Sequence, residues 1–246
     1  MPLRFVQRLG LADGVTAANA AVGFLAVVAA TVDAALAARL ILLAAVADGL
    51  DGVVARRRGS TAAGPYLDSL ADVASFGVAP AALVAAVVRD GRSLATDPVL
   101  VGAAVGIGCL FVGAAVARLG LYTADESGAR ETIGVPTTLA ATVLSAAVVA
   151  GYAAPVPLIA ATAAFALLMG TRVTYPDLHA QDALVMGVVQ AAVVLTPMGH
   201  AATDALPTWI GEGFAFALLF LSCGYLLFGP RFYWGDGIRA PPGLRR

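Results

Sequence analysis

The chain contains no lysine, only two cysteines and few charged residues of either sign. Charged residues make up 13% of its 246 residues, and the net charge of −1 gives no basic field for binding nucleic acid. The cysteines, Cys109 and Cys223, lie in separate apolar runs, which excludes a disulfide framework and a cysteine-based metal site. All 15 basic side chains are arginine, and we interpret this as a compositional bias of the genome.

Apolar residues, by contrast, make up 60% of the chain, and the mean hydropathy is +0.87. These values are far above those of a soluble domain. Because a bilayer core requires about 20 apolar residues per helix, the sequence predicts an all-α, polytopic membrane helix bundle with about eight transmembrane helices. A short interfacial helix is expected at residues 2–12. The predicted segments are residues 14–31, 34–56, 61–88, 96–122, 136–152, 155–170, 182–195 and 206–228.

The order of the segments indicates one membrane-embedded domain over residues 1–230, followed by a polar tail at 231–246. Arginines concentrate on the cytoplasmic side of membrane proteins. If the N-terminus lies inside, that side collects most of the arginines, and only Arg89 and Arg92 fall in an outer loop. The bias predicts a multi-pass protein of the cytoplasmic membrane with both termini inside and the turn at 56–61 at the cytoplasmic face.

Four aspartates, Asp48, Asp51, Asp68 and Asp72, lie on the second and third predicted helices, within one stretch of 25 residues. Residues three or four apart share a helix face, so two antiparallel helices joined by a short turn can direct all four carboxylates at one point. Like charges in an apolar surrounding repel one another, and divalent cations remove that cost. Oxygen ligands suit Mg²⁺, Mn²⁺ or Ca²⁺, and two such ions can clamp a phosphoryl group during its transfer.

Other residues at helical offsets from the aspartates favour a phosphate ligand. Gly52, Ala55 and Gly64 leave room for a bulky ligand at the backbone, and Arg56 supplies a guanidinium for phosphate oxygens. An ion or proton transporter is the alternative, because intramembrane acids also mark ion paths. Transporters more often have broken helices in two related halves, and this sequence has no internal repeat. Membrane prenyltransferases also carry two Asp-rich motifs, but those motifs lie far apart in sequence. The four aspartates here lie within 25 residues, which argues against that class of enzyme.

The order of these residues resembles the signature of the CDP-alcohol phosphotransferases, membrane enzymes that transfer a phosphatidyl-type group from a CDP-activated lipid to an alcohol. The matching pattern is Asp48-x-x-Asp51-Gly52-x-x-Ala55-Arg56, then Gly64-x-x-x-Asp68-x-x-x-Asp72. The turn from Arg56 to Gly64 is one residue shorter than is usual in that family. The resemblance implies a CDP site lined by Gly52, Ala55, Arg56 and Gly64, and two Mg²⁺ or Mn²⁺ ions held by Asp48, Asp51, Asp68 and Asp72.

Five further stretches resemble the phosphatidylserine and archaetidylserine synthase branch of that family, at residues 15–26, 66–81, 117–119, 133–141 and 168–176. This branch often has Asn at the position of Asp13. The resemblance favours L-serine as the acceptor, with glycerol phosphate and inositol phosphate as alternatives. A phosphorylated acceptor would require a denser basic pocket than the scattered arginines provide. The donor would be CDP-archaeol or CDP-diacylglycerol, and the composition favours archaeol.

The resemblance also implies a mechanism, in which Asp72 acts as general base on the serine hydroxyl and CMP leaves. The CDP head group would lie at the cytoplasmic face with the lipid tails in the bilayer. Family members are often dimers, so a homodimer is expected. Weaker candidates for binding the acceptor or the phosphates are Arg118, Thr171, Arg172 and Tyr175.

Overall fold

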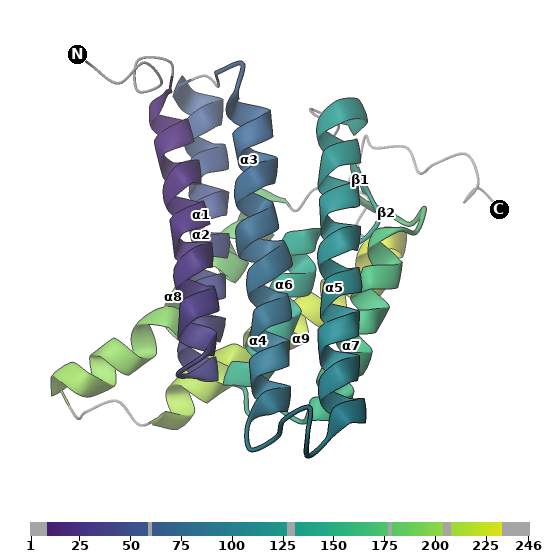
Figure 1. Cartoon of the computed structure of the whole chain (residues 1–246). Coiled ribbons are helices and arrows are strands. Elements are labelled where there is room, and N and C mark those ends of the chain that lie inside the picture. Colours follow the sequence, from purple (N-terminus) through teal and green to yellow (C-terminus); the bar gives the residue numbers. More distant parts are fainter. Residues whose placement is uncertain (1–8, 59–60, 127–130, 177–178, 204–207, 233–246) are drawn as a thin grey trace, which may run out of the picture.

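The computed structural model of the chain is a bundle of helices, most of which reverse direction relative to the helix before them (Figure 1). It describes residues 9–58, 61–126, 131–176, 179–203 and 208–232. The helices are α1 (Leu11–Ala30), α2 (Ala34–Arg58), α3 (Gly64–Asp72), α4 (Ala79–Arg89), α5 (Pro98–Leu121), α6 (Thr137–Val149), α7 (Pro155–Met169), α8 (Ala180–Thr203) and α9 (Thr208–Phe232). Two π-helical stretches, η2 (Val73–Val78) and η3 (Tyr122–Glu126), and two short strands, β1 (Glu131–Ile133) and β2 (Thr174–Pro176), complete the described part.

The predicted helical architecture is confirmed, but eight membrane crossings are not. Among the described residues, four helices are long and apolar enough to cross a membrane: Leu11–Ala30, Gly64–Arg89, Pro98–Ala124 and Trp209–Arg231. The helices Thr137–Val149, Pro155–Met169 and Gln181–Thr196 are apolar but shorter. At about 1.5 Å per residue, the 13 residues of α6 extend about 20 Å, which is less than the ~30 Å bilayer core.

Both ends of the chain differ from the predicted segments. Residues 11 and 12, predicted to end an interfacial helix, belong to the first turn of α1, and residues 1–8 lie outside the described part. At the other end, α9 continues to Phe232, and residues 233–246 of the expected tail are likewise outside it. The strongest membrane segments therefore begin and end within a few residues of their predicted positions.

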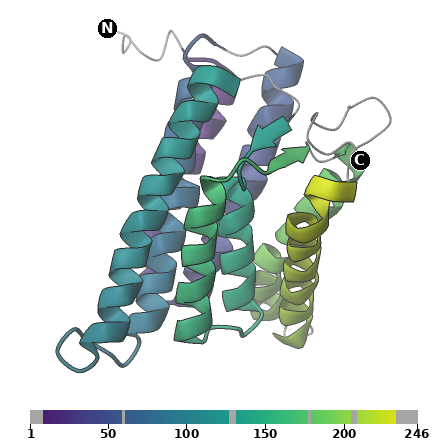
Figure 2. The ribbon, with the colours of Figure 1, turned by 90° about the vertical axis from the view of Figure 1, so that its right-hand side faces the viewer.

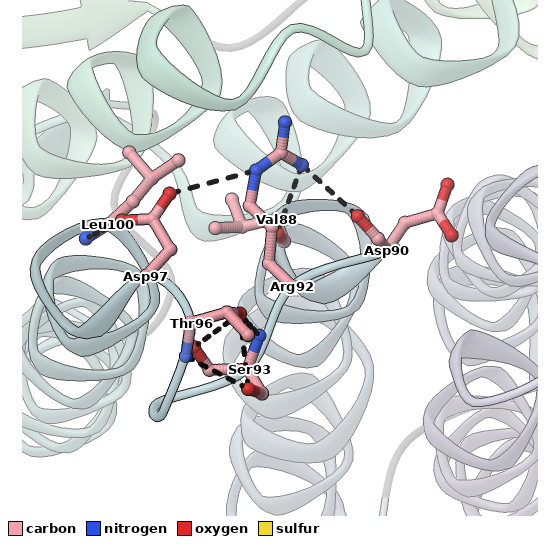
Figure 3. A network of polar contacts seen from close by, with 7 residues as sticks. All are labelled: Val88, Asp90, Arg92, Ser93, Thr96, Asp97 and Leu100. Atoms are coloured by element: carbon pink, nitrogen blue, oxygen red, sulfur yellow. Dashed lines mark hydrogen bonds and ion pairs between the residues drawn. The ribbon is translucent and has the colours of Figure 1, made fainter.

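The predicted start of α5 is confirmed by its cap (Figure 3). The Asp97 carboxylate accepts a hydrogen bond of 3.3 Å from the Leu100 amide, and Pro98 occupies the first turn, where its missing N–H costs nothing. The Arg92 guanidinium lies 3.8 Å from the same carboxylate. The turn between α4 and α5 is thus held by its own side chains.

Small residues control how closely the helices pack. The buried face of α1 ends in Gly23, Ala26, Ala29 and Ala30, small residues of the kind that let helices approach closely in membrane bundles. The central helix is α6, with 11 of its 13 residues buried against α2, α7 and α9 (Figures 1 and 2). It ends three residues before the predicted boundary because Gly151, at φ +85°, turns the chain in a left-handed conformation.

An unpredicted two-stranded ribbon joins two of the sequence stretches singled out above. β1 and β2 pair antiparallel, with Thr132 opposite Tyr175, so residues 133–141 and 168–176 become neighbours (Figure 2). Strands of three residues carry no detectable alternation, so the sequence pattern could not reveal them. Gly134 follows β1 at φ +75°, and a Cβ there would lie 2.3 Å from the Met169 carbonyl oxygen.

The ribbon gives the first prediction. Gly134→Ala is expected to lower the free energy of unfolding by at least about 1–3 kcal/mol, because it combines a strained φ with a backbone clash. Gly113→Ala is the matched control: Gly113 is exposed on α5 and a Cβ there meets nothing within 4 Å. Thermal unfolding in detergent compares the two. Equal unfolding temperatures for both variants would contradict the tight approach of residue 134 to α7.

Candidate metal centre

Three of the four signature aspartates meet at one point. Asp48 of α2 and Asp68 and Asp72 of α3 each place a carboxylate oxygen within 4.8 Å of those of the other two. Asp72 is 8% exposed, and the other two are half-buried. The geometry follows from the local sequence: residues 68 and 72 are one turn apart on α3, and α2 runs antiparallel beside it. The shortened turn before Gly64 does not separate the carboxylates.

The donor set fits a hard divalent cation. Oxygens bound to one Mg²⁺ or Ca²⁺ lie roughly 3–5 Å apart, which is the spread of this triad. Without a cation, three ionised carboxylates this close would raise one another's energy, and burial of Asp72 would add to that cost. The three residues can therefore hold a metal ion, and the charge of that ion would offset their repulsion.

The remaining signature residues lie on the same two helices. Gly52 is half-buried on α2, and Gly64, also half-buried, is the first residue of α3. The backbone of Asp51, Ala55 and Arg56 is helical, but the side chains of these three lie outside the described residues. The predicted placement of a fourth carboxylate and of the guanidinium therefore stays a prediction.

The weaker acceptor candidates lie elsewhere in the bundle. Arg118 is half-buried in the last turn of α5, whereas Thr171, Arg172 and Tyr175 lie together between α7 and the end of β2. The Thr171 hydroxyl donates to the Leu168 carbonyl at 2.7 Å, and Arg172 is exposed. None of the four belongs to the triad of described carboxylates.

Tyr175 has contacts that fix the ribbon. Its hydroxyl donates to the Leu226 carbonyl at 3.2 Å, and the Tyr225 hydroxyl donates in return to the Pro176 carbonyl. The two rings lie 5.9 Å apart. Burial raises the pKa of the Tyr175 phenol, so this hydroxyl remains a protonated donor at neutral pH. These bonds attach the ribbon to α9.

Sequence reasoning missed the polar contacts that hold the triad's helices in place. The buried carboxylate of Asp13 accepts from the Gly10 amide at 2.7 Å and from the Thr61 hydroxyl at 2.8 Å, which ties α1 to the turn that enters α3. Beside Asp68, the Ser69 hydroxyl is hydrogen-bonded to the Thr123 hydroxyl of η3. The Thr123 hydroxyl donates to the Leu119 carbonyl, so Ser69 is the donor.

The sequence of α1 contains a signal for some of these polar contacts. Asp13, Thr16 and Asn19 are all buried and are spaced three residues apart in an otherwise apolar helix. Polar residues that share one face of a membrane helix normally face protein rather than lipid. The spacing alone could therefore have indicated that this face of α1 lies against other helices of the bundle rather than against lipid.

Comparison with known proteins identifies the class. Residues 9–197 match the family model of CDP-alcohol phosphatidyltransferases, and the chain belongs to that family. It is a transferase of phospholipid biosynthesis that moves a phosphatidyl-type group from a CDP-activated lipid to an alcohol, in a family that generally depends on divalent metal ions. The resemblance inferred from the signature is confirmed.

A curated relative agrees with the inferred branch. Over 180 residues the chain is 32% identical to the archaetidylserine synthase of Methanothermobacter thermautotrophicus. The aligned part covers 71% of this chain and 73% of the relative. The similarity therefore extends over most of both proteins.

The triad predicts how metal binding depends on the carboxylates. Asp48→Asn and Asp68→Asn are each expected to weaken Mn²⁺ binding by more than about 10–100-fold. That range is the usual effect of removing a group that only supports a metal ligand, and removal of a ligand itself should have a larger effect. Asp90→Asn is the matched control, because Asp90 is exposed in the turn between α4 and α5. Electron paramagnetic resonance titration of Mn²⁺ with the detergent-solubilised protein measures both. Unchanged affinity in the two triad variants would show that the cluster binds no ion.

Proposed function

We propose that the protein transfers the archaetidyl or diacyl phosphatidyl group of a CDP-activated lipid to the hydroxyl of L-serine and releases CMP. The carboxylate triad of α2 and α3 carries the proposal, since its oxygens within 4.8 Å of one another could hold a divalent cation within a signature for CDP-activated donors. Serine is favoured by the stretches shared with the serine branch and by the similarity to an archaetidylserine synthase. The same similarity favours CDP-archaeol over CDP-diacylglycerol.

The donor site is proposed to lie where the two helices carry no side chain. Gly52 on α2 and Gly64 at the start of α3 are half-buried and would let the nucleotide approach the backbone. Ala55 and Arg56 of α2 are assigned to the same site from the signature. Arg56 would pair with phosphate oxygens of the CDP group. Two Mg²⁺ or Mn²⁺ ions, when held by Asp48, Asp51, Asp68 and Asp72, supply the positive charge that neutralises the diphosphate.

Asp72 is the general base in this mechanism, and it is the most buried of the three carboxylates of the triad. Its carboxylate takes the proton of the serine hydroxyl, the hydroxyl oxygen forms a bond to the lipid-side phosphorus, and the bond from that phosphorus to the CMP oxygen breaks. Because no protein group is covalently modified, positioning and charge stabilisation supply most of the acceleration.

The acceptor would be held from two directions. Arg118 at the end of α5 and Arg172 beside the ribbon are proposed to bind the serine carboxylate or the phosphates, with Thr171 as a neighbouring hydroxyl. The Tyr175 hydroxyl is already bonded to Leu226, so its contribution is to hold the segment that carries Thr171 and Arg172.

The arginine bias supports an orientation with the carboxylate end of the bundle at the cytoplasmic face of the cell membrane. In that orientation, both termini lie inside, residues 1–230 form the membrane domain and residues 231–246 a cytoplasmic tail. The CDP group would enter from the cytosol while the lipid tails remain in the bilayer. A homodimer completes the proposal, as is common in the family.

Turnover tests the acceptor. The purified, detergent-solubilised protein is expected to release CMP from CDP-archaeol with Mn²⁺ or Mg²⁺ only when L-serine is present, and chelation of the metal should abolish release. D-serine and glycerol phosphate are the matched acceptor controls. Release with glycerol phosphate or inositol phosphate but not with L-serine would overturn the acceptor and keep the centre. No release with any acceptor would overturn the transferase assignment of the triad.

A substitution tests the base. Asp72→Asn is expected to keep CDP-lipid binding and to lower kcat by roughly 10²–10⁴-fold, the usual contribution of a general base. Binding is measured with a radiolabelled CDP-lipid and turnover by CMP release, with Asp90→Asn as the control. CMP release at the wild-type rate by Asp72→Asn would refute the role of Asp72.

A further inference from the structure

A fully buried amide lies in α1 and takes no part in the chemistry described above. Asn19 is 0% exposed, and neither its Oδ1 nor its Nδ2 atom has a hydrogen-bond partner among the described residues. A buried donor or acceptor without a partner costs about 1–3 kcal/mol, and an apolar residue of similar size would avoid that cost. Such a group in a membrane helix therefore points to a functional role.

The backbone of Asn19 is fixed against the helix that carries Asp72. The buried hydroxyl of Ser75, in η2, donates to the Asn19 carbonyl at 2.9 Å. One turn further along α1, a Cβ at Gly23 would lie 2.5 Å from Ser75 Oγ and 2.8 Å from Ser75 Cα. Because Gly23 has no Cβ, the backbones of α1 and η2 touch. The position of the Asn19 backbone relative to η2, which directly follows Asp72, is therefore well defined.

The direction of the amide follows from helix geometry. α1 and α3 lie side by side and begin at the same end of the bundle, where Asp13 bonds Thr61 (Figure 1). Cα–Cβ bonds tilt toward the N-terminus of a helix, so the Asn19 side chain extends from the level of Ser75 toward the carboxylates. Asp72 is three residues before Ser75 and, like it, buried, which places it at the next level in that direction.

We infer that Asn19 is a positioning residue for Asp72: in the working enzyme its Nδ2 amide donates the hydrogen bond that orients the Asp72 carboxylate toward the metal and the acceptor hydroxyl. The Ser75 hydroxyl cannot do this, because its single hydrogen is given to the Asn19 carbonyl. This role rests on the proposed function of Asp72. It also explains why η2, whose π-helical turn begins directly after Asp72, is fixed against α1 at this level.

The matched pair that tests the inference is Asn19→Leu and Gln190→Leu. Both replace a buried amide with leucine, but Gln190 lies on α8, where its amide donates to the Thr142 hydroxyl at 3.4 Å. Asn19→Leu is expected to lower kcat by about 10–100-fold, with the KM for CDP-lipid changed by less than about twofold, and to alter the paramagnetic resonance spectrum of bound Mn²⁺. Gln190→Leu should keep the wild-type kcat and spectrum.

A second variant guards against misfolding. Asn19→Ser is small and polar, and its hydroxyl can bond back to its own helix, as the Thr16 hydroxyl bonds the Ala12 carbonyl. It should unfold near the wild-type temperature yet lose kcat as Asn19→Leu does, because no donor reaches Asp72. A wild-type kcat and Mn²⁺ spectrum in Asn19→Ser would overturn the positioning role. Equal losses of kcat in Asn19→Leu and Gln190→Leu, accompanied by equal falls in unfolding temperature, would overturn it as well.

The test of the positioning role of Asn19 can fail or succeed independently of the test of the proposed function. If the wild-type protein releases CMP with another alcohol but not with serine, the same comparison of kcat is made with that alcohol. If the wild-type protein releases no CMP at all, the proposed function fails, and the Mn²⁺ spectrum decides alone. A spectrum altered by both Asn19 variants and unchanged by Gln190→Leu supports the positioning of Asp72, and identical spectra in all variants refute it.

Discussion

Mutual repulsion of carboxylates in an apolar bundle is the constraint on which the rest of this structure depends. Asp48, Asp68 and Asp72 have oxygens within 4.8 Å of one another, and Asp72 is nearly inaccessible to water. At low dielectric, a bound divalent cation would offset this repulsion. The geometry of α2 and α3 therefore fits a divalent-metal site, in agreement with a CDP-alcohol phosphatidyltransferase family that generally depends on divalent metal ions.

The surroundings hold these carboxylates in place by contacts from two sides. From α1, the Asp13 carboxylate accepts a hydrogen bond from Thr61 in the turn before α3. The Asn19 carbonyl accepts a hydrogen bond from the Ser75 hydroxyl, three residues after Asp72. From η3, which follows α5, the Thr123 hydroxyl is hydrogen-bonded to Ser69 next to Asp68. Both π-helical stretches lie in these contacts, η2 after Asp72 and η3 around Thr123, and π-helical turns are frequent where a helix serves a function. Rigid support of this kind is what phosphoryl transfer needs, because its rate depends chiefly on positioning.

The sequence was informative where one residue type has one physical consequence. Aspartates at helical spacing predicted the meeting of residues 48, 68 and 72, and the segment predicted to begin at residue 96 starts within two residues of α5. The ribbon and the π-helical turns could not be predicted, since they arise from tertiary packing such as the Tyr175–Tyr225 contact and leave no periodic pattern. The number of membrane crossings was also beyond the hydropathy pattern, because α6 and α7 are too short for a length criterion to decide. The spacing of Asp13, Thr16 and Asn19 indicates only that this face of α1 contacts protein, and the complete burial of the Asn19 amide is visible only in the structure.

The most direct test of the metal centre is anomalous X-ray diffraction from crystals grown with Mn²⁺ and a CDP-lipid. We expect anomalous peaks within about 2.0–2.6 Å of carboxylate oxygens of Asp48, Asp68 and Asp72, with the diphosphate oxygens completing the coordination. Mn²⁺ bound elsewhere, with these three carboxylates free of metal while the CDP-lipid occupies its site, would contradict the central role of the triad.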